Sequence, residues 1–596
     1  MMPYRQIIAQ SETELRQTRR RIRGISLMRL ALFAIAVVAA IVFGHDGWTV
    51  ILPSAGIPLL LYVWLVKRHD KWFRRKEYLK EKIRVNEQEL RALEYDFADF
   101  DSGEEFADPT HLYAFDLDVF GPHSLFQYVN RTATPVGKRH LAHWFGTHLE
   151  SKEEIEARQE AVRELTPELE FRQQFRLLGL LYKGEPTDIA EIAAWAASPT
   201  RYHSSRFLRM LPPAVLIVNI ACIGAACAGW LPATLAGGVF VGFLVASFAF
   251  TNGVSKTQSI YGKKLKVLAT YADQILLAER KEMRSPALRA LKAEWTSDGQ
   301  TASQAVRRLA RLMNSLDQRG NILMASVLNG LSFWELRQVT RIERWKEEHA
   351  AHLTRWIEAI GEIDAYCSLA TFAYNHADYV YPTFTTTPFR LKAVALGHPL
   401  MDRRKCVRNG IDIDRRPYFI IITGANMAGK STYLRTVGVN YLLACVGAPV
   451  WAERMELYPA RLVTSLRTSD SLTDNESYFF AELKRLKLII DKLEAGEQLF
   501  IILDEILKGT NSMDKQKGSL ALIRQFMALD ANGIIATHDL LLGTLAEAFP
   551  ENIRNHCFEA DIAGDELTFA YRMRDGVARN MNACFLMRKM GIAVAE

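Results

Sequence analysis

The sequence predicts a mainly α-helical region that carries two helical hairpins, followed by a C-terminal α/β domain built on a parallel sheet. Four long apolar runs occur in two pairs with basic flanks, and the stretches between them alternate charged and apolar residues at a helical period. The last third contains short β-branched strands that end in polar residues. Because 596 residues are too many for one hydrophobic core, we expect four units, at residues 1–76, 77–111, 112–389 and 390–596.

Composition excludes some classes of protein. With 49% hydrophobic and 24% charged residues, the chain is typical of a folded protein rather than a disordered one. A net charge of +7 permits contact with nucleic acid or anionic lipid without requiring either. The seven cysteines are scattered singly, with no CxxC pair and no zinc-type spacing, so we expect small buried thiols and a reducing compartment.

The first pair of apolar runs spans residues 27–43 and 48–66, separated by a short polar turn. Each run is about long enough to cross a hydrocarbon core of ~30 Å at 1.5 Å per residue. Basic segments at residues 16–23 and 67–76 flank the pair. By the positive-inside rule both outer ends are cytoplasmic.

The second pair spans residues 211–230 and 232–250. Basic residues again flank it, namely Arg201, Arg206 and Arg209 before it and Lys256, Lys263 and Lys264 after it. The same rule predicts a multi-pass protein of the cytoplasmic (inner) membrane, with lipid as a partner of four helices and the soluble parts in the cytoplasm.

Two other interpretations of these runs stay open. A cleavable signal peptide is disfavoured because the first run continues into a hairpin. Buried core helices are the stronger alternative, since Arg29 and Asn219 interrupt the apolar runs. None of the runs carries an ionisable pair that would indicate a transport path, so we expect anchors rather than a channel.

The middle of the chain is helical in pattern. Amphipathic periodicity covers residues 76–95, 256–284 and 303–368. Pro382, Pro388 and Pro399 then accompany a change to shorter β-rich segments. We place the start of the α/β domain there.

A phosphate-binding motif begins this domain. An apolar strand at 418–423 leads into G-x-x-x-x-G-K-S at 424–431, and a helix is predicted from 432 to 446. The glycines let backbone N–H groups surround phosphate oxygens at a helix N-terminus. Lys430 would contact the β- and γ-phosphates, and Ser431 would bind Mg²⁺. The predicted nucleotide-binding set is Gly424, Asn426, Gly429, Lys430, Ser431 and Thr432.

Two further strands end in residues suited to hydrolysis. The strand at 498–503 is followed by Asp504 and Glu505, and the strand at 533–536 by Thr537 and His538. We expect Asp504 to hold Mg²⁺ together with Ser431, and Glu505 to orient and deprotonate the attacking water. His538 would sense the γ-phosphate, which makes Glu505 and His538 the predicted catalytic pair. Three strand ends meeting at one crevice are typical of a doubly wound sheet.

These motifs resemble the ATPase domain of the MutS mismatch-repair family. The resemblance rests on TGANMAGKSTYLRTVG at 423–438, DEILKGTNSMDK at 504–515, ATHD at 536–539, NESYFFAEL at 475–483, GAPVWA at 447–452 and GHP at 397–399. Residues 130–141 and 158–162 resemble the start of the family's helical core and lever region. The resemblance implies a P-loop NTPase fold of the ABC/MutS type, ATP and Mg²⁺ as cofactors, and a homodimer in which Ser477 reaches the partner's γ-phosphate.

The departures from the family pattern concern DNA recognition more than the chemistry. The N-terminal mismatch-reading domain with its Phe-x-Glu wedge is missing, and residues 284–321 are too few for a full DNA clamp. Within the motifs, Ala425, Ala428, Leu507-Lys508 and Asn511-Ser512 replace the usual residues. The family's C-terminal dimerising helices would follow Ile592.

Two functional hypotheses remain. The first is a dimeric DNA-associated ATPase switch related to mismatch repair, tethered to the membrane and acting on mismatched or branched DNA. The second is a membrane-anchored ATPase motor that acts on a protein or membrane partner without reading mismatches. A transporter and a non-hydrolysing scaffold are disfavoured. The basic residues Arg403, Arg404, Lys405, Arg415 and Arg416 favour a solvated loop over a nucleic-acid surface.

Overall fold

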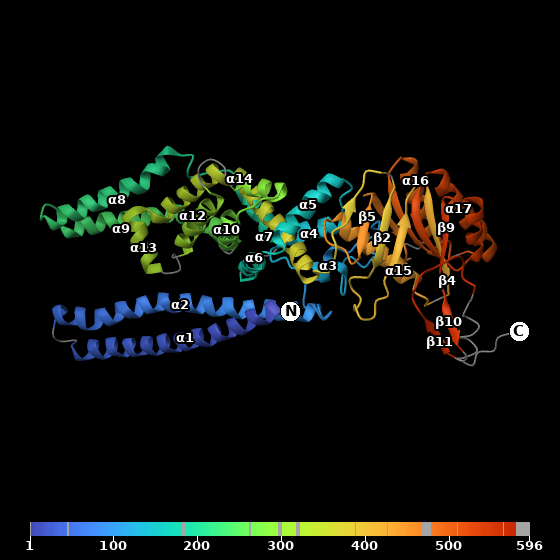
Figure 1. The fold of residues 1–596 in the computed structure, drawn as a ribbon. Helices are drawn as coiled ribbons and strands as arrows, with labels where there is room; N and C mark the ends of the chain where they lie inside the picture. The colour runs from blue at the N-terminus through green and yellow to red at the C-terminus, as the bar shows by residue number, and fades with distance from the viewer. Residues whose placement is uncertain are drawn as a thin grey trace.

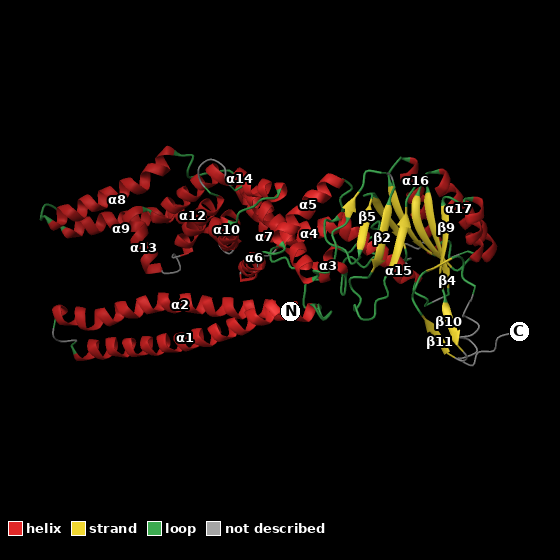
Figure 2. Cartoon of the chain, in the orientation of Figure 1, coloured by secondary structure: helices red, strands yellow, loops and turns green. Residues whose placement is uncertain are grey.

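The molecule is elongated, with helical hairpins at one end and the sheets at the other (Figure 1). The computed structural model describes residues 2–43, 47–181, 186–261, 264–295, 301–317, 322–387, 389–425, 427–467, 478–508, 510–563 and 566–579. Among the described residues, strands are confined to the C-terminal part, and those before them are helical or loop (Figure 2). This order agrees with the predicted helical region followed by an α/β domain.

The first hairpin consists of two very long antiparallel helices, α1 (Met2–Val42) and α2 (Trp48–Ala92). The apolar run predicted at 48–66 and most of the amphipathic segment predicted at 76–95 lie in this one helix, because α2 runs through both without a break. The intervening Lys- and Arg-rich stretch is a good helix former and continues the helix. Pro53 and Pro58 lie inside α2, in its apolar half.

Two helices are apolar and long enough to cross a membrane among the residues that the structure describes, α1 and α8 (Arg206–Cys227), where four runs were predicted. Of the other two runs, one is a shorter apolar stretch at Ala233–Ala249 of α9 (Ala233–Tyr261), and the other is the first half of α2. Core helices of soluble proteins and signal sequences share this length and composition. In α1 and α8, however, the apolar stretch is mostly exposed.

A third apolar helix joins the second hairpin. Helix α13 (Ile322–Ser332) packs against both α8 and α9, and Asn219 of α8 donates hydrogen bonds of 3.1 Å to the carbonyl oxygens of Gly330 and Leu331. The polar residue that interrupts the apolar pattern of α8 therefore has a structural role. It joins α8 to α13.

The remaining helices form the middle of the molecule. They are η1 (Glu104–Phe106), α3 (Leu125–Val129), α4 (Pro135–Gly146), α5 (Lys152–Leu165), α6 (Leu169–Leu181), α7 (Pro186–Ala197), α10 (Lys264–Arg280), α11 (Pro286–Ala293), α12 (Ala302–Asp317) and α14 (Trp334–Asn375). The longest of these, α14, contacts α8, α9 and α13 as well as α4 and α5. It therefore connects the second hairpin with the helices next to the sheets.

A buried ionic cluster fixes the first hairpin to this middle region. The Glu89 carboxylate near the end of α2 accepts hydrogen bonds from Arg131 and Arg176, both at 2.7 Å, and from Asn375 at 3.0 Å. Asn375 also accepts one from the hydroxyl of Tyr4 in α1 at 2.7 Å. The two arginines hold the pKa of Glu89 below its ordinary value although burial opposes this. The cluster stabilises the junction only while Glu89 is ionised.

The C-terminal α/β domain contains a six-stranded sheet in the order β12-β9-β4-β8-β7-β6. Its strands are β4 (Tyr418–Gly424), β6 (Arg461–Ser465), β7 (Leu499–Asp504), β8 (Asn532–Thr537), β9 (Ile553–Phe558) and β12 (Arg574–Asp575). All pairings are parallel except that of β12, and every residue of β4 is buried. Its helices are α15 (Lys430–Cys445), α16 (Tyr478–Glu494), α17 (Ser512–Ala528), η3 (Leu540–Thr544) and α18 (Leu545–Ala548).

Two smaller sheets complete the domain. One has the order β1-β5-β2-β3, with β1 (Thr383–Phe384), β2 (Leu391–Leu396), β3 (Asn409–Ile413) and β5 (Arg454–Leu457), and the other is a hairpin of β10 (Ala560–Ala563) and β11 (Glu566–Phe569). In the main sheet Thr423 pairs with Thr537, and Asp504 with Ala536. The carboxyl ends of the three predicted strands thus meet at one edge, as the sequence predicts.

Candidate active site

The loop after β4 is shaped by two glycines. Gly424 has φ +149°, and a Cβ there would lie 2.3 Å from the carbonyl oxygen of Phe558, so the closely approaching strand β9 leaves room only for glycine. Gly429, at φ +108°, directly precedes α15. The loop therefore turns sharply into a helix N-terminus, where backbone N–H groups favour a bound anion.

Lys430 is the first residue of α15, two residues earlier than the predicted helix start, and its side chain turns back over the loop. The residue is 5% exposed, and Nζ donates hydrogen bonds to the carbonyl oxygens of Gly424 at 2.7 Å and Ala425 at 3.0 Å. Burial lowers its pKa, whereas Asp504 and Glu505 raise it. A buried cation thus lies under the loop, where it can contact phosphate oxygens.

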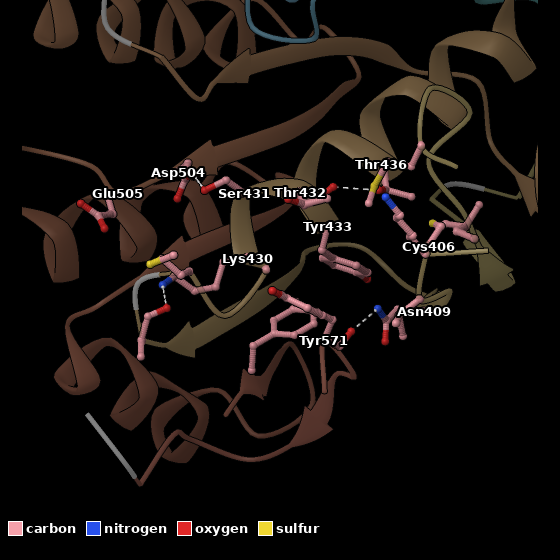
Figure 3. Close-up of a pocket in the computed structure, with 18 of the residues that line it drawn as sticks. Cys406, Asn409, Lys430, Ser431, Thr432, Tyr433, Thr436, Asp504, Glu505 and Tyr571 are labelled. Atoms are coloured by element: carbon pink, nitrogen blue, oxygen red, sulfur yellow. Dashed lines mark hydrogen bonds between the residues drawn. The ribbon is translucent and has the colours of Figure 1, made fainter. Parts of the chain in front are cut away.

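Ser431 and Asp504 face each other across the crevice (Figure 3). The Ser431 hydroxyl donates to Oδ2 of Asp504 at 2.5 Å, joining the first turn of α15 to the end of β7. A hydroxyl and a carboxylate are oxygen ligands of the kind that Mg²⁺ prefers. Thr432 is the next residue of α15, with its side chain exposed. The structure therefore brings the two predicted metal ligands together.

Glu505 and His538 are in direct contact. Nε2 of His538 lies 2.6 Å from Oε1 of Glu505, and this hydrogen bond, against the effect of partial burial, lowers the pKa of Glu505 to about 2. Glu505 has a left-handed backbone, φ 51°, and its N–H donates to the carbonyl of Ala536 at 2.9 Å. A non-glycine residue in this conformation is strained, which is frequent at active sites. The carboxylate is ionised at neutral pH and points into the crevice with His538.

Glu482 in α16 supports the segment that follows Glu505. Its buried carboxylate accepts hydrogen bonds from the backbone N–H groups of Leu507 and Lys508. Burial raises the pKa of Glu482 although these bonds lower it. Glu482 belongs to the NESYFFAEL motif, so the structure gives this acidic residue a positioning role.

A cavity of about 680 Å³ is lined by Lys430, Ser431, Thr432, Asp504, Glu505 and His538. Its lining also includes Leu396, Met401, Lys405, Cys406, Val407, Asn409, Tyr433, Phe558 and Tyr571, of which Figure 3 labels Cys406, Asn409, Tyr433 and Tyr571. The apolar lining can accommodate a planar base, with the phosphates toward Lys430. Tyr433 belongs to the phosphate-loop motif at 423–438, and Lys405 belongs to the basic residues named from the sequence. Sequence reasoning missed the others because they come from separate segments with no shared motif, although the GHP motif is next to Leu396.

The remaining residues singled out from the sequence are two site residues, Asn426 and Ser477, and the five basic loop residues. Asn426 and Ser477 fall outside the described residues. Of the basic loop residues, Lys405 lines the cavity, while the four arginines have protein partners. These pairs are Arg403 with Asp378, Arg404 with Asp402, Arg415 with Asp414, and Arg416 with Gln498.

An ionic contact connects the crevice with the helical region. Asp118 accepts from Arg435 of α15 at 3.0 Å, and from Arg467 at 2.6 and 2.7 Å. Arg435 is one helical turn beyond Ser431, and Arg467 follows β6. Asp116 adds hydrogen bonds to the backbone N–H groups of Leu466 and Arg467. The segment before α3 is thereby bonded to α15, which lines the cavity, and to the segment that follows β6.

A central parallel sheet, a glycine loop with a buried lysine, and acidic residues at neighbouring strand ends define a nucleotide-hydrolysing domain of the P-loop class. Comparison with known proteins gives the family. Residues 115–370 match the model of MutS domain III, and residues 420–595 match that of MutS domain V. The chain belongs to the MutS family, and its C-terminal part is the family's ATPase domain.

The curated relatives are distant and longer than the aligned region. The DNA mismatch repair protein MutS of Thermotoga neapolitana is 32% identical over 255 residues, which is 42% of this chain and 31% of that protein. The MutS proteins of Thermotoga petrophila and Thermotoga maritima are each 30% identical over 254 residues, again 42% of this chain and 30% of theirs. The alignments thus span less than a third of these relatives.

Proposed function

We propose that this chain is a membrane-tethered ATPase switch, in which ATP binding and hydrolysis at the domain V crevice change the arrangement of the helical region. The observation that carries the proposal is the set of contacts at the strand ends, where Ser431 meets Asp504 and Glu505 meets His538. ATP and Mg²⁺ fit this site because it offers a buried lysine, a hydroxyl–carboxylate pair and an apolar pocket in one cavity.

Each residue then has a defined task. Lys430 neutralises phosphate charge, while Ser431 and Asp504 would hold Mg²⁺, which supplies further charge neutralisation on the phosphates. Glu505 takes the proton of the attacking water. With a pKa of about 2, Glu505 is a weak base while His538 holds it. If His538 turns to a phosphate oxygen, it leaves Glu505, whose pKa rises toward its ordinary value, and the carboxylate becomes a stronger base.

Asp118 is the proposed link from the crevice to the helical region. A movement of α15 or of the segment after β6 changes its bonds to Arg435 and Arg467. Because Asp118 precedes α3 and α4, and α4 packs on α14, the change can reach the long helix. Hydrogen exchange in residues 108–119 that is identical with and without ATP would remove the support for this link.

Membrane tethering is supported by the position of the exposed apolar surface. The tips of α1/α2 and of α8/α9 lie at the same end of the molecule, away from the sheets (Figure 1). Large apolar side chains there are exposed, among them Leu30 at 68%, Ile41 at 71% and Leu60 at 72%. Exposed apolar surface of this extent marks a membrane or protein contact. The ATPase domain would then lie on the cytoplasmic side of the cytoplasmic membrane.

The proposed homodimer places Ser477 of one chain at the γ-phosphate of the other. Lys430→Ala should weaken nucleotide binding about 10- to 100-fold, because charged hydrogen bonds contribute roughly 1.5–3 kcal/mol. Mixing Ser477→Ala chains with Lys430→Ala chains should restore activity, since each mixed dimer keeps one intact composite site. A mixture as inactive as either variant alone would weigh against a shared site.

The direct test of the tethered ATPase uses the full chain reconstituted from detergent into phosphatidylcholine vesicles. We expect the protein to float with the vesicles, to stay with them in high salt, and to show Mg²⁺-dependent ATP hydrolysis in the floating fraction. If the ATPase activity stays in the fraction that does not float, the chain is an ATPase but the membrane tether is refuted.

DNA is the second candidate partner, favoured because the aligned relatives are DNA mismatch repair proteins. Fluorescent homoduplex, mismatched and branched DNA should be titrated with and without ATP at physiological salt. Tight binding modulated by ATP would support a DNA-associated switch. Intact hydrolysis without DNA binding would leave a protein or the membrane as the partner on which the motor acts.

A further inference from the structure

The paired helices α1 and α2 bring two basic segments together at one level of the hairpin. Contacts along the pair fix its register. The rings of Phe33 and Tyr62 lie 6.0 Å apart, and the Arg21 guanidinium lies 4.7 Å from the Trp72 ring centroid. Nearer the chain terminus, Arg75 bonds Glu14 at 2.6 Å. The apolar run 27–43 therefore pairs with 48–66, and the basic segment 16–23 pairs with 67–76.

We call residues 16–23 and 67–76 the basic belt. It contains eleven lysines and arginines and one acidic residue, Asp70. Within the described residues, four of the eleven have a carboxylate within 4 Å, namely Arg16, Arg74, Arg75 and Lys76. The other seven have no such partner there, and all of these are exposed; they are Arg19, Arg20, Arg21, Arg23, Lys67, Arg68 and Lys71. The belt therefore has a large excess of unneutralised positive charge.

Aromatic side chains accompany these cations. Arg68 lies 5.2 Å from the Trp64 ring centroid, and Lys76 lies 4.5 Å from that of Phe73. Tryptophan and tyrosine are enriched where a protein passes from hydrocarbon to headgroups, because one part of the ring is apolar and the other polar. Exposed apolar residues begin immediately beyond the belt, at Leu27.

We propose that the basic belt binds the headgroups of anionic phospholipids at the surface of the membrane that the hairpin tips enter. The proposal rests on the membrane tether proposed above and names the lipid class that strengthens it. Nucleic-acid phosphate offers the same charge. Bound there, however, it would leave the adjoining apolar side chains in water, whereas a bilayer covers both surfaces at once. Each Lys or Arg near an anionic surface contributes roughly 1 kcal/mol, a factor of about five in binding.

The test compares two variants of equal net charge in the full chain. The belt variant carries Arg19→Gln, Arg20→Gln, Arg23→Gln and Lys71→Gln. The control carries four exposed cations replaced elsewhere, Arg289→Gln, Arg311→Gln, Lys517→Gln and Arg524→Gln. Flotation is measured with vesicles of pure phosphatidylcholine and with vesicles containing about one third phosphatidylglycerol, in low and in high salt.

We expect the belt variant to bind phosphatidylglycerol vesicles about 600-fold more weakly than the control at low salt, since four cations each contribute a factor of about five. The difference should vanish in ~1 M salt, where the Debye length is about 3 Å, and on pure phosphatidylcholine. Equal flotation of both variants on anionic vesicles would overturn the proposal. The proposal would also be overturned if the belt variant no longer binds a short DNA duplex that the control binds, while it still floats with anionic vesicles as the control does. Failure of both chains to float with any vesicle would instead refute the tether itself.

Discussion

The two ends of this molecule differ in the exposure of their apolar residues, which are buried at the sheet end and exposed at the hairpin end. At the sheet end, β4 is completely buried and α15 nearly so, and the charged side chains around them are held by specific hydrogen bonds. At the hairpin end, helices of similar apolar character expose Leu30, Ile41 and Leu60. Apolar composition therefore does not by itself specify burial within the chain. One end is buried by its own chain, and the proposed membrane tether would cover the other with lipid.

The largest expected effect is a loss of hydrolysis at the sheet end that leaves vesicle binding by the hairpin end unchanged. Glu505→Gln should preserve nucleotide binding but slow hydrolysis about 10²- to 10⁴-fold, because it removes the base and keeps its shape. Vesicle flotation should be unchanged. Single-turnover kinetics measures the rate of hydrolysis, and vesicle flotation of the same preparation measures membrane binding. Turnover at the wild-type rate would show that another group is the base.

The reciprocal change lies in the hairpin. Ile35→Asp places a charge in the apolar half of α1, where the side chain is 53% exposed. At the middle of a bilayer this costs roughly 3 kcal/mol, so vesicle binding should fall about 100-fold while ATP hydrolysis in detergent stays normal. Ile35→Leu is the matched control. If Ile35→Asp floats like its control, this part of α1 does not enter lipid.

Between the two ends, Asp364 of α14 gives a pH-dependent stability. Its carboxylate accepts from the backbone N–H groups of Ala133 and Thr134 and from the Thr134 hydroxyl, yet burial raises its pKa from 3.8 to about 6. A carboxyl group whose pKa is higher in the folded than in the unfolded state contributes stability that is fully present below about pH 4. This contribution is lost as the pH rises through 6. Relative to Asp364→Asn, the wild type should lose up to about 3 kcal/mol between pH 4 and 7.

Thermal unfolding of both chains across this pH range checks the prediction. The pH dependence of the difference in unfolding free energy is decisive, because a cost of the asparagine that is the same at every pH shifts the difference without changing its slope. Parallel curves would show that Asp364 titrates normally in the folded protein.

The smallest effect concerns the link between crevice and helices. Asp118→Asn should cost about 1 kcal/mol or less, because Asp118 is partly exposed and surface ion pairs contribute little. Basal hydrolysis should change only a few-fold. We expect instead that ATP-dependent hydrogen exchange in residues 108–119 decreases, with Asp414→Asn as the control. An unchanged ATP response of hydrogen exchange in the Asp118→Asn variant would show that Asp118 does not couple the crevice to the helical region.

Sequence predicted the local parts of this structure well. The three strands leading to Gly424, Asp504 and Thr537 end within one residue of their predicted positions, because each is a contiguous apolar run next to a motif. The MutS family resemblance is confirmed for domains III and V. The domain boundaries and the roles of the site residues stay predictions.

The remaining features depend on contacts between distant segments. Nothing in the sequence around Tyr571 or Cys406 indicates that both line the cavity of Lys430. Similarly, the direct Glu505–His538 contact results from the pairing of β7 with β8, which no motif records. The sequence also did not indicate that residues 48–66 and 76–92 form one helix, because the composition changes from apolar to basic between them, although both compositions favour a helix.

The length of α14 has a mechanical consequence. Its 42 residues extend about 63 Å at 1.5 Å per residue, from Trp334 near the second hairpin to Asn375 near the sheets. If this rod pivots by ten degrees about its sheet end, its far end travels about 11 Å. A small change beside the nucleotide would thus become a displacement of about one third of the ~30 Å thickness of a bilayer's hydrocarbon layer.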